Sequence, residues 1–202
     1  MSAASRFNIK KRNTNQRTTE HNVSQTALVL RNGGIAVIRT DTLYGIVGSA
    51  LRKDVVERMY RLKKRGKDKP FIILIGRIAD VKLFGITPSR VAKKAMATLW
   101  PGKNSLIMET SQKEELRYLH RGGCTLAFRL PDDACLRSLL KATGPLVAPS
   151  ANSEGERPAA TIHEAEQYFG KRVDAYVDGG RIRTTRPSKV FSVTDSVLKR
   201  LR

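Results

Sequence analysis

The chain has 202 residues and a formal net charge of +20, because 38 lysines and arginines outnumber 18 aspartates and glutamates. Hydrophobic residues make up 40% of the sequence and charged residues 28%, a balance typical of one globular domain. No apolar run approaches the roughly 20 residues of a membrane-spanning helix, so we expect no membrane partner.

The excess of positive charge favours polyanionic partners such as nucleic acids and nucleotides. A tRNA or another double-stranded RNA is therefore a candidate partner, and a solvated basic surface is the alternative. Aromatic residues make up only 6% of the chain and form no base-stacking motif among the basic residues. This argues against a dedicated single-strand binder.

Residues 1–23 are polar and basic and predict a flexible N-terminal arm, with an organellar presequence as the alternative. Residues 24–202 predict a single folded domain. Cys124 and Cys135 are too few for a disulfide scaffold, and we interpret them as small core residues in a reducing cytoplasm. The expected location is therefore cytoplasmic.

Apolar periodicity and turn residues predict alternating helices and strands along residues 24–202. Predicted helices cover 24–30 before Gly33 and Gly34, 54–64, 87–99 with Thr87 as N-cap, 132 or 133 to 143, and 161–169 with a Thr161/Glu164 capping box. Predicted strands cover 35–38, 71–75, 105–108, 125–130, 146–148, 175–177 and 190–193, and 39–48 reads as a turn-rich connection. This alternation predicts an α/β sheet covered by helices.

The common nucleotide and catalytic signatures are missing. The sequence contains neither a phosphate-binding loop of the G-x-x-x-x-G-K-[ST] type nor a G-x-G-x-x-G turn. His21, His120 and His163 stand apart from other metal ligands, so we expect no metal held by the protein itself. Ser150 lacks the flanking glycines of a nucleophile elbow.

Three polar segments follow predicted strands or helices, where α/β sheets bind ligands. Residues 39–45 carry two threonines and an aspartate, residues 63–69 carry five cations, and residues 148–153 carry short hydroxyl and amide side chains. The basic segment suits phosphate binding, because lysine and arginine match phosphate oxygens. Ordinary turns and a solvated helix end are the alternatives for all three.

The order of these segments resembles the YrdC family, whose best-known members are threonylcarbamoyl-AMP synthases. The resemblance extends from about residue 24 to residue 202. Its motifs are Thr40-Asp41-Thr42-Leu43-Tyr44-Gly45, Lys63-x-Arg65 with Pro70, Arg129-x-Pro131, Pro149-Ser150-Ala151-Asn152 and Pro187-Ser188. It implies a YrdC-like catalytic domain: a twisted open mixed sheet with helices on both faces and a basic concave cavity.

The resemblance also implies roles for individual residues. The catalytic set, which also binds ATP, is Lys63, Arg65, Ser150 and Asn152. Further nucleotide contacts are Lys69, Thr125 and Arg202, and the threonine contacts are Thr42, Arg129 and Ser188. We expect Lys63 and Arg65 to lie on an exposed loop.

The implied reaction joins L-threonine, bicarbonate and ATP, with Mg²⁺ on the phosphates, into threonylcarbamoyl-AMP and pyrophosphate. A downstream threonylcarbamoyl transferase complex would then modify position 37 of tRNAs. Such chemistry needs positioning and positive charge rather than a protein nucleophile.

The sequence departs from the family pattern at several positions. Arg39 replaces a proline, Leu74 replaces a common histidine, and Ala159 and Lys189 replace small hydroxyl residues. Two alternatives stay open: a paralogue that makes another carbamoyl-adenylate, and an RNA-binding or ribosome-associated factor without catalysis.

Overall fold

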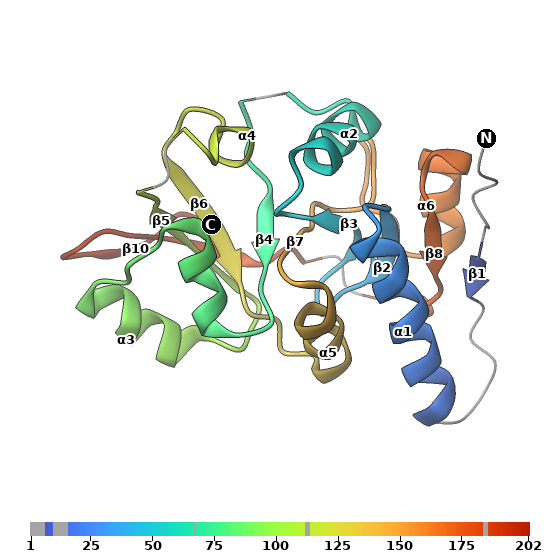
Figure 1. Cartoon of the computed structure of the whole chain (residues 1–202), viewed down its shortest axis with the longest axis horizontal. Coiled ribbons are helices and arrows are strands. Elements are labelled where there is room, and N and C mark those ends of the chain that lie inside the picture. Colours follow the sequence, from blue (N-terminus) through green and yellow to red (C-terminus); the bar gives the residue numbers. More distant parts are fainter. Residues whose placement is uncertain (1–6, 10–15, 67, 112–113, 184–185) are drawn as a thin grey trace.

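A computed structural model describes residues 7–9, 16–66, 68–111, 114–183 and 186–202. One mixed sheet of ten strands runs through the described residues in the order β1-β8-β2-β3-β7-β4-β6-β5-β9-β10, with β1 and β10 at opposite ends of the molecule (Figure 1). The strands are β1 (Phe7–Ile9), β2 (Ala36–Arg39), β3 (Tyr44–Ser49), β4 (Ile72–Leu74), β5 (Asn104–Glu109), β6 (Thr125–Arg129), β7 (Leu146–Val147), β8 (Ala175–Val177), β9 (Lys189–Val193) and β10 (Leu198–Arg200).

Helices connect the strands and cover the sheet. They are α1 (Gln16–Arg31), α2 (Lys53–Lys63), the 3-10 helix η1 (Ile78–Phe84), α3 (Arg90–Leu99), α4 (Arg117–His120), α5 (Ala134–Thr143), α6 (Ile162–Phe169) and the 3-10 helix η2 (Gly170–Arg172). None of the helices in the described ranges has the length and apolar character to cross a bilayer.

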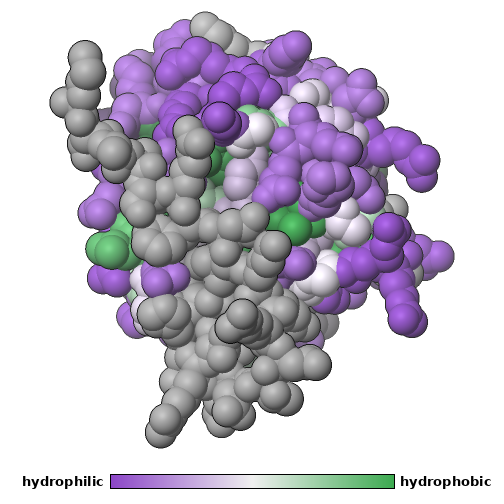
Figure 2. Space-filling view, turned by 90° about the vertical axis from the view of Figure 1, so that its right-hand side faces the viewer, coloured by the Kyte–Doolittle hydropathy of each residue, from purple (hydrophilic) through white to green (hydrophobic). Residues whose placement is uncertain are grey.

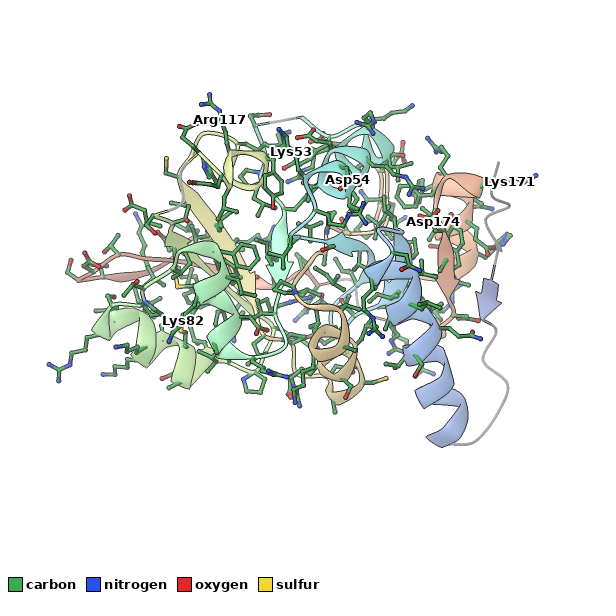
Figure 3. All side chains as sticks on the ribbon, in the orientation of Figure 1. Lys53, Asp54, Lys82, Arg117, Lys171 and Asp174 are labelled. Carbon is green, nitrogen blue, oxygen red and sulfur yellow. The ribbon has the colours of Figure 1, made fainter. Side chains whose placement is uncertain are left out.

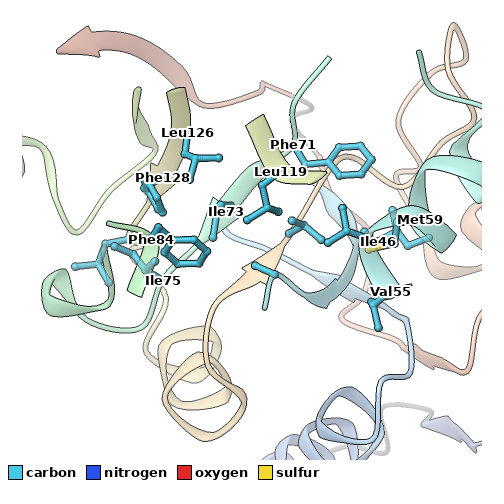
Figure 4. Packing of buried hydrophobic residues seen from close by; sticks show 14 of the residues in the cluster. Ile46, Val55, Met59, Phe71, Ile73, Ile75, Phe84, Leu119, Leu126 and Phe128 are labelled. Atoms are coloured by element: carbon cyan, nitrogen blue, oxygen red, sulfur yellow. The ribbon is translucent and has the colours of Figure 1, made fainter. Parts of the chain in front are cut away.

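Alternating side chains of the strands divide the core into two layers. Val37 of β2 joins a large cluster with residues of α2, α3, α4 and α6, whereas its neighbours Ala36 and Ile38 join a smaller cluster with α1 and α5. Since successive side chains of a strand point to opposite faces, the two clusters lie on opposite faces of the sheet. In the larger cluster, the rings of Phe84 and Phe128 lie 5.2 Å apart (Figure 4). The predicted α/β fold with helices on both faces is confirmed.

Several element boundaries differ from the prediction. The segment predicted as a turn-rich connection contains all but the last residue of β3, in which residues 44–47 pair with β2 and residues 48–49 pair with β7. The strand was not predicted from the sequence, because Gly45 and Gly48 interrupt its apolar pattern. The predicted helix at 87–99 begins only at Arg90, and Ser89 rather than Thr87 is its N-cap. The helices η1 and α4 were not predicted.

Part of the segment predicted as a flexible arm belongs to regular structure. The first helix begins at Gln16 rather than at Ser24, and Phe7–Ile9 pair in parallel with β8. The remaining positions of that segment lie outside the described residues. The polar residues of 16–23 hid the first two turns of α1, because an apolar stripe is the main signal of a helix.

The face of the molecule shown in Figure 2 is mainly hydrophilic where its residues are described, as expected from the high charge. Hydrophilic residues cover most of the described surface in Figure 2, and the labelled charged side chains in Figure 3 project from the ribbon. The interpretation of both cysteines as core residues is wrong for Cys135, which is exposed on α5, while Cys124 is half-buried.

Helix caps follow the sequence signals. The side chain of Thr161 accepts a hydrogen bond from Glu164 N, as in the predicted capping box, but the Glu164 carboxylate accepts from Ala160 N rather than from the cap residue itself. At the start of α5, Asp133 Oδ1 accepts from Leu136 N at 2.8 Å, so Asp133 rather than Asp132 is the cap.

Replacing Asp133 by alanine is expected to lower the free energy of unfolding by about 1 kcal/mol, because the first turn of α5 loses its acceptor. Asp132→Ala is the matched control: its side chain is 69% exposed and its ion pair with Arg137 is long, at 3.6 Å. That variant is expected to change stability by less than about 0.5 kcal/mol. Urea unfolding of both variants checks this, and equal losses would contradict the assignment of the cap.

Candidate active site

A cavity of about 440 Å³ opens over the strands β4, β6, β5 and β9. Along β6, Leu126 and Phe128 enter the larger core cluster, while Thr125, Ala127 and Arg129 line the cavity. The cavity therefore lies on the face opposite that cluster, the same face that α1 and α5 cover elsewhere. Its lining includes the following residues: Thr40, Thr42, Tyr44, Gly45, Arg65, Pro70, Phe71, Ile72, Ile107, Thr125, Arg129, Ser150, Pro187, Ser188, Val190 and Arg202.

One wall is a buried polar cluster built by the turn between β2 and β3. Arg129 donates from Nη1 to Thr42 Oγ1 at 2.9 Å, and its Nη2 lies 3.2 Å from Asp41 Oδ1. The Arg129 and Asp41 side chains are only 5% and 4% exposed. Burial lowers the pKa of Arg129, and the Asp41 carboxylate counteracts this effect. Arg129 Nε and Asp41 Oδ1 have no hydrogen-bond partner among the described residues.

Thr40 fixes the turn that carries this cluster. Its hydroxyl donates to Leu43 O at 2.7 Å and accepts from the backbone N–H groups of Thr42 and Leu43. Because these bonds are local, the sequence Thr-Asp-Thr specifies the turn by itself. The turn directs Thr42 into the cavity and Asp41 against Arg129.

The opposite wall comes from the chain around β9 and β10. Ser188 is buried, and its hydroxyl lies 3.0 Å from Ser105 Oγ on β5. Arg202 Nη2 donates to Ser188 O at 3.1 Å. Thr125 lines the cavity from the start of β6. Ser188, Arg202 and Thr125 therefore lie around one cavity with Thr42 and Arg129, although up to 160 residues separate them in the sequence.

Arg65 and Ser150 line a third side of the cavity. Arg65 follows the left-handed residue Lys64 (φ 52°), which caps α2, and the Arg65 Nε donates to Lys69 O at 3.0 Å. Ser150 follows β7 and forms a bridge with Gly45 of β3. A Cβ at position 45 would lie 3.3 Å from Thr40 Cγ2, so glycine suits this close approach.

Lys63 lies beneath the cavity wall and not on an exposed loop, so that part of the prediction is wrong. It is the last residue of α2 and is 2% exposed. Its Nζ donates to Ser150 O at 2.5 Å and to Asn152 O at 2.6 Å, with Asn152 Oδ1 at 3.5 Å. Burial, and secondarily the charge of Arg65, lower the pKa of Lys63 to about 7.

Asn152 and Lys69 also lie outside the residues that line the cavity. Asn152 Nδ2 donates to Ser153 O and Glu156 O, both at 2.8 Å, and so closes the turn after Ser150. Lys69 Nζ pairs with Glu154 at 2.7 Å. Three predicted residues, Lys63, Asn152 and Lys69, therefore shape the wall behind the cavity.

Some residues of the site were not among those predicted. Asp41 pairs with Arg129. Its position in the Thr40-Asp41-Thr42 motif was the sequence signal that could have identified it as a residue of the site. Tyr44 lines the cavity, donates to Gly180 O at 2.8 Å and accepts from Gly179 N at 2.9 Å. Burial raises the pKa of Tyr44 to about 12, so its hydroxyl keeps its proton at neutral pH. Nothing in the sequence pointed to Ser105, whose role depends on the pairing of β5 with β9.

Within the described residues, no group of three or more histidine, cysteine, aspartate or glutamate side chains is arranged to hold a metal ion. His120 is buried and its Nδ1 accepts from the backbone N–H groups of Gly122 and Cys124. This histidine therefore fixes the loop before β6.

Comparison with known proteins places the chain in a family. The model of the Sua5/YciO/YrdC family, described as "Telomere recombination", matches residues 28–202. The threonylcarbamoyl-AMP synthase of Bacillus subtilis (strain 168) is 32% identical over 183 residues, which cover 89% of this chain and 52% of the relative. The chain thus spans about half the length of the curated relatives it matches first.

Solved structures agree with this assignment. P. abyssi Sua5 complexed with L-threonine has a TM-score of 0.85 and 26% identity, and the match covers 98% of this chain and 57% of that one. E. coli YciO shares the fold with a TM-score of 0.81 at 24% identity, covering 98% and 94% of the two chains. Since the family model covers most of the sequence, this chain belongs to the Sua5/YciO/YrdC family.

Proposed function

We propose that this chain is a threonylcarbamoyl-AMP synthase, a nucleotidyltransferase that makes threonylcarbamoyl-AMP and pyrophosphate from L-threonine, bicarbonate and ATP. The observation that carries the proposal is the cavity that gathers Thr42, Arg65, Arg129, Ser188 and Arg202 from distant segments. The name of the B. subtilis relative and the L-threonine bound to P. abyssi Sua5 support the same reaction.

The amino acid is assigned to the wall formed by Thr42, Arg129 and Ser188. Arg129 carries the positive charge that a carboxylate needs, and its Nε lacks a partner among the described residues. The Asp41 carboxylate holds Arg129 in place, so a substrate carboxylate would share this guanidinium with it. The hydroxyl groups of Thr42 and Ser188 supply short polar contacts for a small side chain.

The triphosphate is assigned to Arg65 and Arg202, which line the cavity, with Thr125 and the hydroxyl of Ser150 as further contacts. Together with Arg129 they would supply the positive charge of the basic cavity that the family resemblance implies. Lys63 acts from behind this wall by fixing the backbone of Ser150 and Asn152. The Asn152 side chain closes the turn that follows by donating to Ser153 O and Glu156 O. Lys69 holds Glu154 at the edge of the same segment.

The chemistry follows from this arrangement. Bicarbonate would supply carbon dioxide and hydroxide. The neutral threonine amine forms a C–N bond with the carbon dioxide while one C=O π bond opens, and the proton that the nitrogen loses combines with the hydroxide as water, which leaves a carbamate. A carbamate oxygen then forms a bond with the α-phosphorus of ATP, and the bond to pyrophosphate breaks. The protein positions the reactants and stabilises negative charge, and no side chain becomes a nucleophile.

Mg²⁺ would enter this site on the phosphates of ATP, where it neutralises charge on the transferred group. Such an ion keeps several water ligands and needs few from the protein, which fits a cavity lined by arginines and hydroxyl groups. The Asp41 carboxylate is buried in its ion pair with Arg129, so we do not assign it to Mg²⁺.

The product would pass to a threonylcarbamoyl transferase complex that modifies position 37 of tRNAs. Direct binding of tRNA or another double-stranded RNA is the second function to test, because the chain carries a net charge of +20. Residues 24–202, together with the first turns of α1 from Gln16, are proposed as the catalytic domain, and the cytoplasm is proposed as its location.

Pyrophosphate release from ATP and bicarbonate is expected only when L-threonine is present, with serine and glycine as comparison substrates. Coupled phosphate detection measures the rate. Release that does not depend on threonine would favour a paralogue that makes another carbamoyl-adenylate. A folded protein that releases no pyrophosphate but binds tRNA with strong salt dependence would favour the RNA-binding function.

Arg65→Ala is expected to lower kcat/KM for ATP at least about a hundredfold, because a phosphate contact within the cavity is lost. Arg65→Lys is expected to lose most of this activity as well, since a point charge does not replace a planar fork with two donors. Steady-state kinetics with varied ATP measures both. Arg61→Ala is the control, an exposed arginine of α2 one turn earlier, and it should retain full activity. Full activity of Arg65→Lys would contradict the assigned role.

The stability contributed by Lys63 is expected to depend on pH. Its pKa in the folded protein, about 7, lies below its ordinary value, so the unfolded chain binds more protons from about pH 7 to pH 10. The cost of the buried charge is complete below pH 7 and falls as the pH rises. Relative to Lys63→Met, wild-type stability should rise over this range by at most about 1.4 kcal/mol per pH unit. Urea unfolding at pH 6, 7.5 and 9 measures the difference, and parallel pH profiles would contradict it.

A further inference from the structure

Four side chains from three separate segments form one continuous stack that ends at the cavity. The guanidinium carbon of Arg121 lies 3.8 Å from the ring centre of Tyr60. The Tyr60 ring stacks on Phe71, with centroids 4.1 Å apart and planes inclined by 23°. The guanidinium of Arg65 lies over Phe71, at 5.5 Å from its ring centre. Of the four, Phe71 and Arg65 line the cavity.

We propose that Arg121 and Tyr60 are positioning residues that hold the guanidinium of Arg65 at the cavity wall. This inference rests on the proposed function, because it takes Arg65 as a contact for the ATP phosphates. Arg121 and Tyr60 do not line the cavity themselves, so they would act through Phe71 and Arg65.

Hydrogen bonds reinforce the stack at its cavity end. Tyr60 Oη and Arg65 Nε both donate to the carbonyl oxygen of Lys69, each at 3.0 Å. The shared acceptor fixes the distance between the stacked ring and the Arg65 side chain. With Nε engaged in this way, no hydrogen bond within the described ranges occupies the two terminal nitrogens of Arg65. These nitrogens form the fork that matches phosphate oxygens.

Arg121, at the end of the stack away from the cavity, is buried with two nitrogens that are unpartnered among the described residues, which is energetically unfavourable. Its retention there favours a functional role. Arg121 has a side chain that is 10% exposed and pairs with Glu57 at 2.7 Å. Its Nε and Nη2 are buried without a hydrogen-bond partner in the described part of the chain. A buried donor without an acceptor is unfavourable, and the contact with the Tyr60 ring offsets only part of this penalty.

Backbone strain occurs at both ends of the same stack. Lys64, directly before Arg65, has φ 52°, and Arg121 itself has φ 55°. Left-handed backbone is unfavourable at residues other than glycine and persists where the surroundings enforce it. Left-handed backbone therefore occurs next to Arg65, which lies on Phe71, and at Arg121, which lies on Tyr60.

A purely structural clamp between α4 and α2 is the competing explanation, and a double-mutant cycle separates the two. Arg121→Lys keeps the charge and its Glu57 partner but loses the planar group that stacks on Tyr60. It is expected to raise KM for ATP about tenfold while kcat changes less than about twofold, because Arg65 is displaced rather than lost. In an Arg65→Ala background, the same change should alter KM for ATP less than about twofold.

The controls use neighbouring residues and a second variant. Arg117→Lys alters an arginine of α4 that is 71% exposed and projects into solvent (Figure 3), and it should leave KM for ATP unchanged. If Arg121→Lys does not fold, Tyr60→Phe serves instead. It keeps the ring and removes only the hydroxyl that bonds Lys69 O, and it should raise KM for ATP about fivefold in wild type and not in Arg65→Ala.

Calorimetric titration with ATP keeps this inference separable from the proposed function. Wild-type protein that binds ATP but releases no pyrophosphate would refute the synthase. The double-mutant cycle would then be measured as ATP affinities. It would support the inference if Arg121→Lys weakens ATP binding only when Arg65 is present. Equal effects of Arg121→Lys in both backgrounds would overturn the inference and leave the synthase intact. Wild-type protein without ATP affinity would overturn both.

Discussion

The buried ammonium group of Lys63 joins two parts of the chain that lie 87 residues apart in the sequence. Its three N–H donors are directed at oxygens of Ser150 and Asn152, so the end of α2 and the turn after β7 cannot move independently. A buried charge without such acceptors would be strongly destabilising. This interaction therefore fixes the relative positions of Arg65, two residues after Lys63, and Ser150, one of the acceptors, and both of these residues line the cavity.

The cavity itself results from incomplete cover on one face of the sheet. Leu126 and Phe128 of β6 pack into the core, so the residues between them must point to the other face. There α1 and α5 cover β2 and β7, and the cavity opens beside them over β6 and β5. A sheet with only part of one face covered by helices is a rigid floor for a ligand, because its backbone hydrogen bonds are satisfied within the sheet.

The walls of this cavity differ in how they are stabilised. Local hydrogen bonds of Thr40 hold the turn that carries Thr42 and Asp41. Arg65 depends instead on contacts with Phe71 and Lys69, and its position is thus tied to the packing of α2. Membership of the Sua5/YciO/YrdC family is consistent with both walls, since the matched region, residues 28–202, includes all the residues that form them.

Local patterns in the sequence predict the α/β class, most strand positions and the five motifs of the site. The signals of a continuous apolar strand, such as 71–75, and of a turn residue, such as Thr40, depend only on neighbouring residues. Such features are therefore predictable from the sequence. The burial of Lys63 follows from the assembled fold and not from local sequence, because its acceptors come from a segment that begins 87 residues away. The same holds for the pairing of Asp41 with Arg129 and for the stack of Arg121 on Tyr60. These contacts depend on the order of strands in the sheet, and the burial that gives each charge its role exists only after the strands have assembled.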